Sequence, residues 1–349
     1  MGELHRNFTF SLCIFPIRCR CGLCSPPSLH YRGALKTLAN LLNYYPMKNV
    51  VLLLSLLLSP AVLAVTYDLP SEHFDMIGAP RTVVATYEDT LVEIARRSGV
   101  GLEQIERVNP DVDSWLPGEG THVVVPSQYI LPRAPRKGIV LNLPEMRLYY
   151  YPPQLPGRPQ QVQTYPIGIG RMDWATPLGQ TKIVSKTKDP AWRPPESIRR
   201  EHAAKGDPLP LLVPAGPDNP LGAYAMGLGM PGYLIHGTNK PIGVGMRVSH
   251  GCIRMLPEDI ARLFPQVPVG TPVNIVNQPV KAGWYGGKLY LEVHPALEEY
   301  PNTRGALVQE AQMALNSAMA GRAAKLDSGA IEAELSRKTG LPLVISTGR

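Results

Sequence analysis

Two short stretches in the last third of the chain are the most informative: Tyr233-Leu234-Ile235-His236-Gly237-Thr238 and Val248-Ser249-His250-Gly251-Cys252-Ile253-Arg254-Met255. A cysteine becomes a good nucleophile where a neighbouring base or cation lowers the thiol pKa from about 8.5. His236 and His250 are the candidate bases for Cys252. Glycine adopts backbone conformations that other residues avoid, so the N–H groups around Gly251 and Cys252 are natural donors to an oxyanion.

This pattern resembles the L,D-transpeptidase (YkuD) family, whose signature is an upstream His-Gly pair followed by Ser-His-Gly-Cys. The continuation Gly-Cys-Ile-Arg-Met also matches, as do Pro166-Ile167-Gly168-Ile169-Gly170 and Thr176-Pro177-Leu178-Gly179. The resemblance covers roughly residues 136–277. It implies a mainly β protein, with an antiparallel β-rich catalytic domain over residues 137–277.

The resemblance also implies roles for individual residues. Cys252 would be the nucleophile and His236 the general acid/base, with the backbone carbonyl of Gly237 orienting the imidazole ring, as the third member of a triad does. His250 would shape the loop and, with the backbone of Gly251, contribute to the oxyanion hole. His250 as the base itself remains the alternative.

Three further residues near the cysteine are candidates for substrate binding: Arg254, Ser249 and Arg247. A guanidinium can hold a substrate carboxylate with two parallel hydrogen bonds. Arg254 and Arg247 can equally pair with structural acids, and the sequence leaves this open. The insertion over residues 186–228 is rich in Pro, Gly and charge. Because loops of this length are often functional, we expect a stiff cover over the site, with an inert surface loop as the alternative.

Strand-like runs dominate the region of the resemblance. Pro144-Glu145 reads as a hairpin turn, and Pro257-Glu258-Asp259 is typical of a helix start, since proline fits the first turn and acids favour it. We expect one helix at residues 257–264 and strands at residues 138–143, 147–151, 162–168, 179–185, 232–236 and 272–276.

Residues 81–126 are expected to form a small unit with the order strand, helix, helix, strand. Glu88-Asp89-Thr90 offers capping chemistry for the first helix, and Asn109-Pro110 ends the second. The unit resembles a LysM module, although Glu88 replaces the usual glycine of that turn. This resemblance implies binding to the N-acetylglucosamine backbone of peptidoglycan; a spacer without a ligand is the alternative.

The segments around these two units carry less information. Residues 127–136 are Pro-rich and basic and are expected to be a linker. Residues 278–349 form a C-terminal extension that we expect to be partly helical, because residues 304–341 are rich in Ala, Glu and Gln.

The N-terminal region has the pattern of an export signal. Met47-Lys48-Asn49 precedes an apolar run and small residues up to Ala64, which is typical of a signal peptide at residues 47–64. Because such a peptide normally begins at the initiator Met, we expect residues 1–46 to be an extension upstream of the true start. Its four cysteines (Cys13, Cys19, Cys21, Cys24) lack zinc-site spacing.

Export changes the charge of the chain and its cysteine content. The full sequence has 35 basic and 28 acidic residues and a net charge of +7. Residues 1–64 contribute five of these positive charges, so the remainder does not suggest nucleic acid as a partner. Cys252 is then the only cysteine. In an exported chain a lone cysteine is structural, intermolecular or reactive.

The resemblance implies a reaction on the bacterial cell wall. Cys252 would attack after diaminopimelate in a peptidoglycan tetrapeptide stem, expel D-Ala and pass the acyl group to an amine. The acceptor would be another stem or a lysine of an outer-membrane lipoprotein. This chemistry needs no cofactor or metal, and the location would be the periplasm, without a transmembrane anchor after cleavage. The alternatives are an L,D-carboxypeptidase or other Cys/His wall peptidase, and a non-catalytic wall-binding scaffold.

Overall fold

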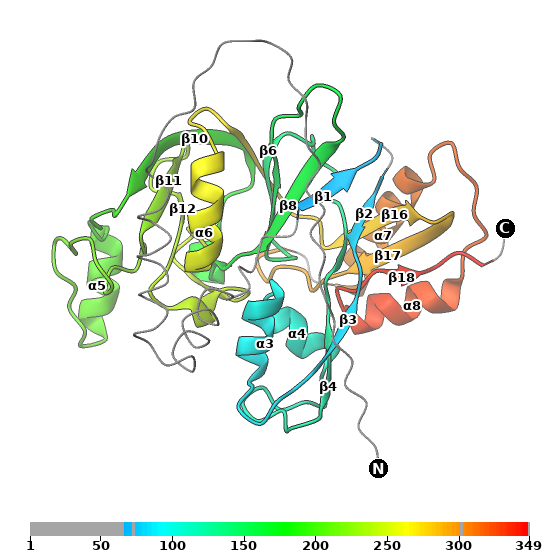
Figure 1. Cartoon of the computed structure of the whole chain (residues 1–349), viewed down its shortest axis with the longest axis horizontal. Coiled ribbons are helices and arrows are strands. Elements are labelled where there is room, and N and C mark those ends of the chain that lie inside the picture. The colour runs from blue at the N-terminus through cyan, green and yellow to red at the C-terminus, as the bar shows by residue number, and fades with distance from the viewer. Residues whose placement is uncertain (1–65, 72–73, 301–302, 348–349) are drawn as a thin grey trace, which may run out of the picture. The chain divides into compact units, whose positions relative to one another are not determined.

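Nine strands drawn from across the chain form one sheet in this computed structural model, which describes residues 66–71, 74–300 and 303–347 (Figure 1). Most neighbouring strands are antiparallel, while β6 and β15 and also β12 and β14 are parallel. The predicted antiparallel β-rich architecture is therefore confirmed. In sheet order the strands are β1 (Thr66–Leu69), β8 (Gln160–Pro166), β7 (Arg147–Tyr151), β6 (Gly138–Asn142), β15 (Pro272–Val276), β10 (Gly179–Lys188), β11 (Tyr224–Leu228), β12 (Leu234–His236) and β14 (Ile253–Arg254).

The centre of this sheet is buried on both faces. Every residue of β6 and β7 is buried, which explains why these strands read as continuous apolar or aromatic runs rather than as an alternating pattern. Leu141 and Leu148 pack into one core, whereas Val140 and Tyr149 pack into a second core on the other face. Helix α6 (Pro257–Leu263) contributes Ile260 and Leu263 to the first core.

Several short elements surround the cysteine loop. Strands β9 (Ile169–Gly170) and β13 (Arg247–Ser249) pair in parallel as a separate ribbon. The 3-10 turn η1 (Met172–Trp174) follows β9 in the sequence, and η2 (Pro241–Gly243) precedes β13. A third, η3 (Phe264–Gln266), follows α6 directly. The insertion over residues 186–228 is more regular than a loop, because it contains helix α5 (Glu196–Ala204) and all of β11.

Residues 81–126 have the predicted order of strand, helix, helix, strand. The elements are β3 (Arg81–Val84), α3 (Leu91–Ser98), α4 (Leu102–Val108) and β4 (His122–Val125). Thr90 and Glu93 form a reciprocal capping box at the start of α3, which satisfies two free backbone N–H groups. Apolar residues of all four elements form one small core.

The segment expected to be a linker, residues 127–136, is partly a structural strand. Strand β5 (Gln128–Ile130) pairs with β2 (Met76–Gly78) in an antiparallel ladder. Tyr129, Ile130 and Leu131 are almost fully buried. Proline and basic residues dominate the composition of this segment, but these apolar side chains bury enough surface to order its first half.

The C-terminal extension contains a second sheet and two helices, so the helical character predicted for residues 304–341 is confirmed. Strands β16 (Val280–Tyr285), β17 (Lys288–Val293) and β18 (Leu343–Val344) pair in that order. Helices α7 (Arg304–Ala318) and α8 (Ser328–Arg337) pack on this sheet (Figure 1), and its strand β16 also contacts β2 and β5.

The extension is joined to the main sheet by a buried charge network. The Lys281 ammonium lies 2.8 Å from a carboxylate oxygen of Glu145 and 2.8 Å from one of Glu292. His294 bonds the same Glu292 carboxylate at 2.7 Å. Glu145, Glu292 and His294 are grouped closely enough to hold a metal ion, but the Lys281 ammonium supplies the positive charge between the two carboxylates.

The predicted signal peptide at residues 47–64, the extension at residues 1–46 and its four cysteines lie outside the described residues. Within the part of the chain that the structure describes, no helix combines the length and apolarity needed to cross a membrane.

Candidate active site

Parallel pairing of β12 with β14 brings the two informative stretches together. His236 lies opposite Arg254 in the ladder, and the N–H of Met255 donates to the carbonyl of His236 at 2.8 Å. Cys252 directly precedes β14, and its sulfur lies beside β12, 3.6 Å from the carbonyl oxygen of Gly232. A histidine, a thiol and a guanidinium from two separate segments therefore gather around one pair of strands at the sheet edge.

His236 is held in a defined tautomer. Its side chain is only 4% exposed, and Nδ1 lies 2.6 Å from the backbone carbonyl oxygen of Gly237. A carbonyl oxygen only accepts, so Nδ1 carries the proton and the lone pair of Nε2 is left free. Burial, aided by the nearby charge of Arg254, lowers the pKa of His236 to about 4. The ring is thus neutral at neutral pH and able to accept a proton.

Cys252 is a half-buried free thiol. Burial raises the pKa of Cys252, opposed by a backbone hydrogen bond from Leu234 and by the charge of Arg254. The sulfur also lies 3.6 Å from the carbonyl oxygen of Gly232. The resting thiol is therefore protonated, and its activation requires a base within the site.

The turn before the cysteine depends on close backbone packing. Gly251 has a φ of +96°, and a Cβ there would lie 2.8 Å from a ring carbon of Tyr233. A Cβ on Gly170 would lie 2.9 Å from the Cα of Gly251. Thr176 links the two segments, because its hydroxyl donates to the Gly251 carbonyl at 2.9 Å and accepts from the Gly170 N–H at 3.2 Å. Gly170 and Gly251, one from each motif, thus allow the two backbone segments to pack closely against each other.

Arg254 differs from the other arginines of the site because its charge is not paired. Among the described residues, no carboxylate lies within ion-pair distance of it, and its buried Nε has no hydrogen-bond partner. Burial lowers the pKa of Arg254, with the neighbouring Cys252 opposing. Of the two roles left open by the sequence, this arrangement favours an external carboxylate over a structural acid.

The part of the chain that matches a known protein family includes His236 and Cys252. Residues 136–275 match the YkuD family, the L,D-transpeptidase catalytic domain. The chain is 42% identical over 313 residues to the probable L,D-transpeptidase ErfK/SrfK of Escherichia coli (strain K12), spanning 86% of this chain and 98% of that relative. The chain belongs to the L,D-transpeptidase family. It is therefore an enzyme of this family, as the cysteine motif predicted.

A second relative supports the same assignment. The probable L,D-transpeptidase YbiS of Escherichia coli (strain K12) is 44% identical over 238 residues, which is 67% of this chain and 76% of the relative.

The catalytic domain of the E. faecium L,D-transpeptidase, solved by NMR, aligns with a TM-score of 0.31 at 23% identity, over 42% of this chain and all of that one.

Two predicted substrate-binding residues of this L,D-transpeptidase, Ser249 and Arg247, form hydrogen bonds within the protein. The hydroxyl of buried Ser249 donates to the carbonyl of Cys252 at 2.5 Å, so it braces the turn from inside. Arg247 donates to both carboxylate oxygens of Glu299, at 2.8 and 3.0 Å, and to the carbonyl of Gly170 at 3.2 Å. The geometry thus gives both residues a role in holding the loop rather than a free surface for substrate.

His250 contacts Glu201, a residue that the sequence did not predict to lie at the site. Its Nε2 lies 3.0 Å from a carboxylate oxygen of Glu201 on α5, and its ring meets Trp174 edge-on at 5.1 Å between centroids. Glu201 also accepts from Arg171 at 3.0 and 3.1 Å and from Lys205 at 2.7 Å. These partners hold the pKa of Glu201 well below its usual range. The insertion is therefore fastened to the cysteine loop by a charged side chain.

Nothing near His250 in the sequence pointed to Glu201. The two residues are separated by 49 positions, and Glu201 belongs to an insertion that the composition describes as an irregular loop. The helical run Glu196–Ala204 was the one available signal, because it has an acid at its start and a histidine near its end.

Proposed function

We propose that this L,D-transpeptidase acts on the tetrapeptide stems of peptidoglycan through a thioester on Cys252. The observation that carries the proposal is the neutral, Nδ1-protonated His236 on β12, whose partner strand β14 directly follows a free, half-buried thiol. A buried imidazole with a free Nε2 is the group needed to take a proton from a thiol whose pKa is raised.

Acylation begins when the Cys252 sulfur attacks the carbonyl carbon between diaminopimelate and D-Ala. The thiol proton passes to Nε2 of His236, while the Gly237 carbonyl holds the opposite side of the ring. The C–N bond then breaks, and His236 returns the proton to the amine of the leaving D-Ala. The acyl group is left as a thioester on the sulfur.

Stabilisation of the intermediate is assigned to the loop backbone. Among the described residues, no hydrogen bond uses the backbone N–H of Gly251 or Cys252, which leaves both as donors to an oxyanion. The unpaired guanidinium of Arg254 binds a carboxylate of the substrate. His250 supports the loop instead of acting as the base, because its Nε2 is engaged by Glu201.

Transfer requires an amine as the second substrate. The amine attacks the thioester carbonyl, and His236 takes its proton. The C–S bond then breaks, and His236 returns this proton to the sulfur, which restores the thiol. The acceptor is a lysine of an outer-membrane lipoprotein or the diaminopimelate of another stem. Hydrolysis by water would make the protein an L,D-carboxypeptidase instead.

The unit at residues 81–126 is proposed to be a LysM-like module that binds the glycan of the wall. Its order of elements is that of the resembled family. With the signal peptide proposed at residues 47–64, the enzyme works in the periplasm, where peptidoglycan is the available substrate.

Purified protein incubated with tetrapeptide muropeptides tests the proposal. We expect release of D-Ala together with cross-linked dimers, or with lipopeptide when a lysine peptide is added. Both products should disappear in Cys252→Ala. Release of D-Ala without any transfer product would contradict transfer and leave a carboxypeptidase. Full wall-linking activity in Cys252→Ala would contradict the thioester mechanism and leave the scaffold alternative.

A further inference from the structure

The C-terminal extension and the basic segment that precedes the catalytic domain enclose a cleft of about 760 Å³. Residues 131–136 form one side of it, and β16 forms the other together with the end of α7 and the turn after this helix. We call it the extension cleft. Its volume is within the range of pockets that bind small organic ligands. Its described lining contains no residue of the cysteine loop or of the His236 stretch, so it is separate from the active site.

Positive charge prevails in the extension cleft. Its charged lining residues are three arginines, Arg133, Arg136 and Arg322, and one acid, Asp75. The Nη2 atom of Arg136 lies 3.6 Å from one carboxylate oxygen of Asp75, and the other oxygen accepts the backbone N–H of Trp284 at 3.0 Å. One carboxylate against three guanidinium groups leaves an excess of two positive charges in the cleft.

The two arginines that carry this excess are held in place without using their charge. Arg322 stacks over the indole of Trp284, with its guanidinium carbon 4.8 Å from the ring centroid, and Trp284 is fixed by donating from Nε1 to the carbonyl of Ala318 at 2.7 Å. The backbone of Arg133 bonds the side-chain amide of Gln278 at 2.8 and 2.9 Å. Neither guanidinium has an ion-pair partner among the described residues. Stacking uses only the face of a guanidinium, so the N–H groups at its edge remain available to a ligand.

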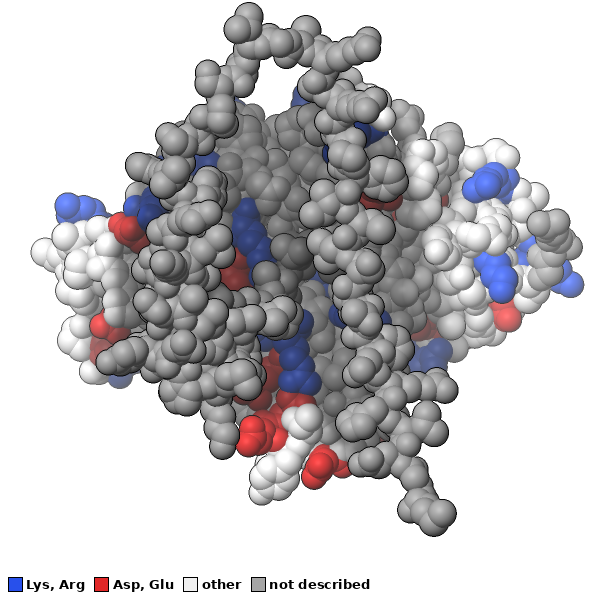
Figure 2. Space-filling view, viewed as in Figure 1, with Lys and Arg blue, Asp and Glu red and all other residues white. Residues whose placement is uncertain are grey.

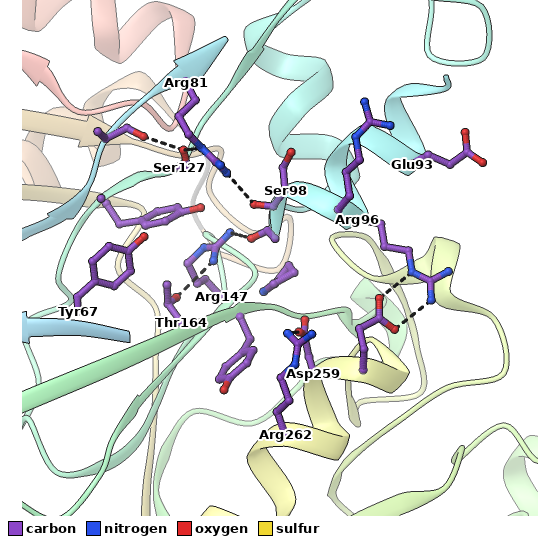
Figure 3. A pocket seen from close by; sticks show the side chains of 18 of the residues that line it. Tyr67, Arg81, Glu93, Arg96, Ser98, Ser127, Arg147, Thr164, Asp259 and Arg262 are labelled. Atoms are coloured by element: carbon purple, nitrogen blue, oxygen red, sulfur yellow. Dashed lines mark hydrogen bonds and ion pairs between the residues drawn. The ribbon is translucent and has the colours of Figure 1, made fainter. Parts of the chain in front are cut away.

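A larger cleft, about 1040 Å³ between residues 81–126 and the catalytic domain, has no such excess (Figure 3). Its lining holds five arginines and five acidic residues. Arg96 bonds both carboxylate oxygens of Glu258 at 2.7 and 3.0 Å, and Arg97 pairs with Asp89. Figure 2 shows basic and acidic side chains intermixed in that hollow. Unpaired positive charge therefore distinguishes the extension cleft from the larger one.

The lining of the extension cleft also indicates the size and chemistry of its ligand. Guanidinium groups bind carboxylates and phosphates through parallel hydrogen bonds. A single phosphate would fill only a small part of this volume, and the arginines come from two segments far apart in the sequence. A ligand of peptide size with several separate carboxylates fits better. Small side chains on the cleft walls leave room for its backbone; they are Ala134, Ala282, Ala318 and Ala320.

We propose that the extension cleft binds a stem peptide of peptidoglycan at a second, non-catalytic site, with Arg133 and Arg322 holding its carboxylates. A stem peptide attached to the wall carries more carboxylates than amines, which matches the positive excess of the cleft. The proposal rests on the proposed function, because the wall supplies the peptide. It goes further by giving the C-terminal extension a binding role, which would keep the enzyme where free stems are present.

Titration calorimetry with an N-acetylated tetrapeptide stem tests the site in the exported protein carrying Cys252→Ala, which cannot consume the peptide by the proposed mechanism. We expect a binding event that the combined change Arg133→Gln and Arg322→Gln weakens at least about tenfold, because each change removes charge-assisted hydrogen bonds. Binding at the active site should not respond to these changes. Arg337→Gln, which removes an exposed arginine of α8 outside the cleft, is the matched control and should leave the affinity unchanged.

The variants should fold normally, because both arginines are exposed. Thermal melting checks this, and Arg133→Gln alone stays informative if loss of the Arg322 stacking lowers the melting temperature, since Arg133 makes no such contact.

Three outcomes would overturn the inference. They are unchanged binding in the double variant, equally strong binding of a stem peptide whose carboxylates are amidated, and binding of inorganic phosphate in place of the peptide, which would assign the cleft to phosphate ligands. If a carbapenem acylates Cys252 in wild type while the double variant and its parent bind the peptide equally, this inference fails and the proposed function stands.

Discussion

At the scale of single residues, the proposed mechanism depends on two groups that are both neutral at rest. Burial lowers the pKa of His236 to about 4 and raises that of Cys252. Neutral thiol and neutral imidazole persist over a wide pH range, so the proton moves only when the sulfur attacks. This differs from a resting thiolate–imidazolium pair, in which charge separation precedes attack.

The pH dependence of acylation follows from these two pKa shifts. Protonating His236 removes the lone pair that accepts the thiol proton, so the rate should fall as pH drops through about 4. Between about pH 5 and about pH 8 the rate should stay nearly constant. Stopped-flow measurement of carbapenem acylation would give this profile. A midpoint near 6.5, the pKa of an unperturbed histidine, would contradict the neutral buried base.

The identity of these residues was predictable from the sequence, but their partners were not. Cys252, His236 and Gly251 belong to two short motifs whose chemistry can be read directly. Glu299, which engages Arg247, and Glu201, which engages His250, lie 52 and 49 positions away. Neither ion pair leaves a local pattern, because contacts at that separation depend on how the whole chain folds.

At the scale of elements, helix α5 is the largest departure from expectation. The insertion was predicted to be a long loop that forms a stiff cover, yet it contains a helix whose Glu201 carboxylate binds Arg171, Lys205 and His250. Arg171 and His250 lie outside the helix, so their bonds to this carboxylate give the helix a defined position beside the cysteine loop. Proline-rich flanks had obscured this short helix in the sequence.

Replacing Glu201 by Gln tests whether this helix positions the loop. Loss of the negative charge should lower kcat/KM about three- to tenfold and should also lower the pKa of His250, since Glu201 raises it. NMR titration of the histidines and steady-state kinetics would measure both effects. Glu196→Gln, at the exposed start of the same helix, is the matched control. An unchanged His250 pKa would show that this contact is not formed in solution.

At the scale of the whole molecule, individual strands were easier to predict than the way in which they pair and pack. Strands β7 and β15 begin and end at the predicted residues because each is a short run of mostly apolar or aromatic residues. The pairing of β2 with β5 and the sheet of the C-terminal extension were not foreseen. These elements are short, and their burial comes from neighbours far away in the sequence.

We expect the buried network around Lys281 to stabilise the junction between the C-terminal extension and the main sheet. Lys281→Met would leave Glu145 and Glu292 facing each other without a cation, at a cost of about 3–5 kcal/mol in the free energy of unfolding. Chemical denaturation would measure it. Lys288→Met, at an exposed site on the same hairpin, should change stability by less than about 0.5 kcal/mol. Equal stability of both variants would contradict a role for the network.

The most direct test of the central claim is the intact mass of the protein after exposure to a carbapenem. If Cys252 is the nucleophile that His236 activates, wild type should gain the mass of one inhibitor, and peptide mapping should locate it on Cys252. Cys252→Ala should gain nothing, and His236→Gln should react far more slowly. An adduct that persists in Cys252→Ala, or a wild-type protein that stays unmodified, would contradict the account.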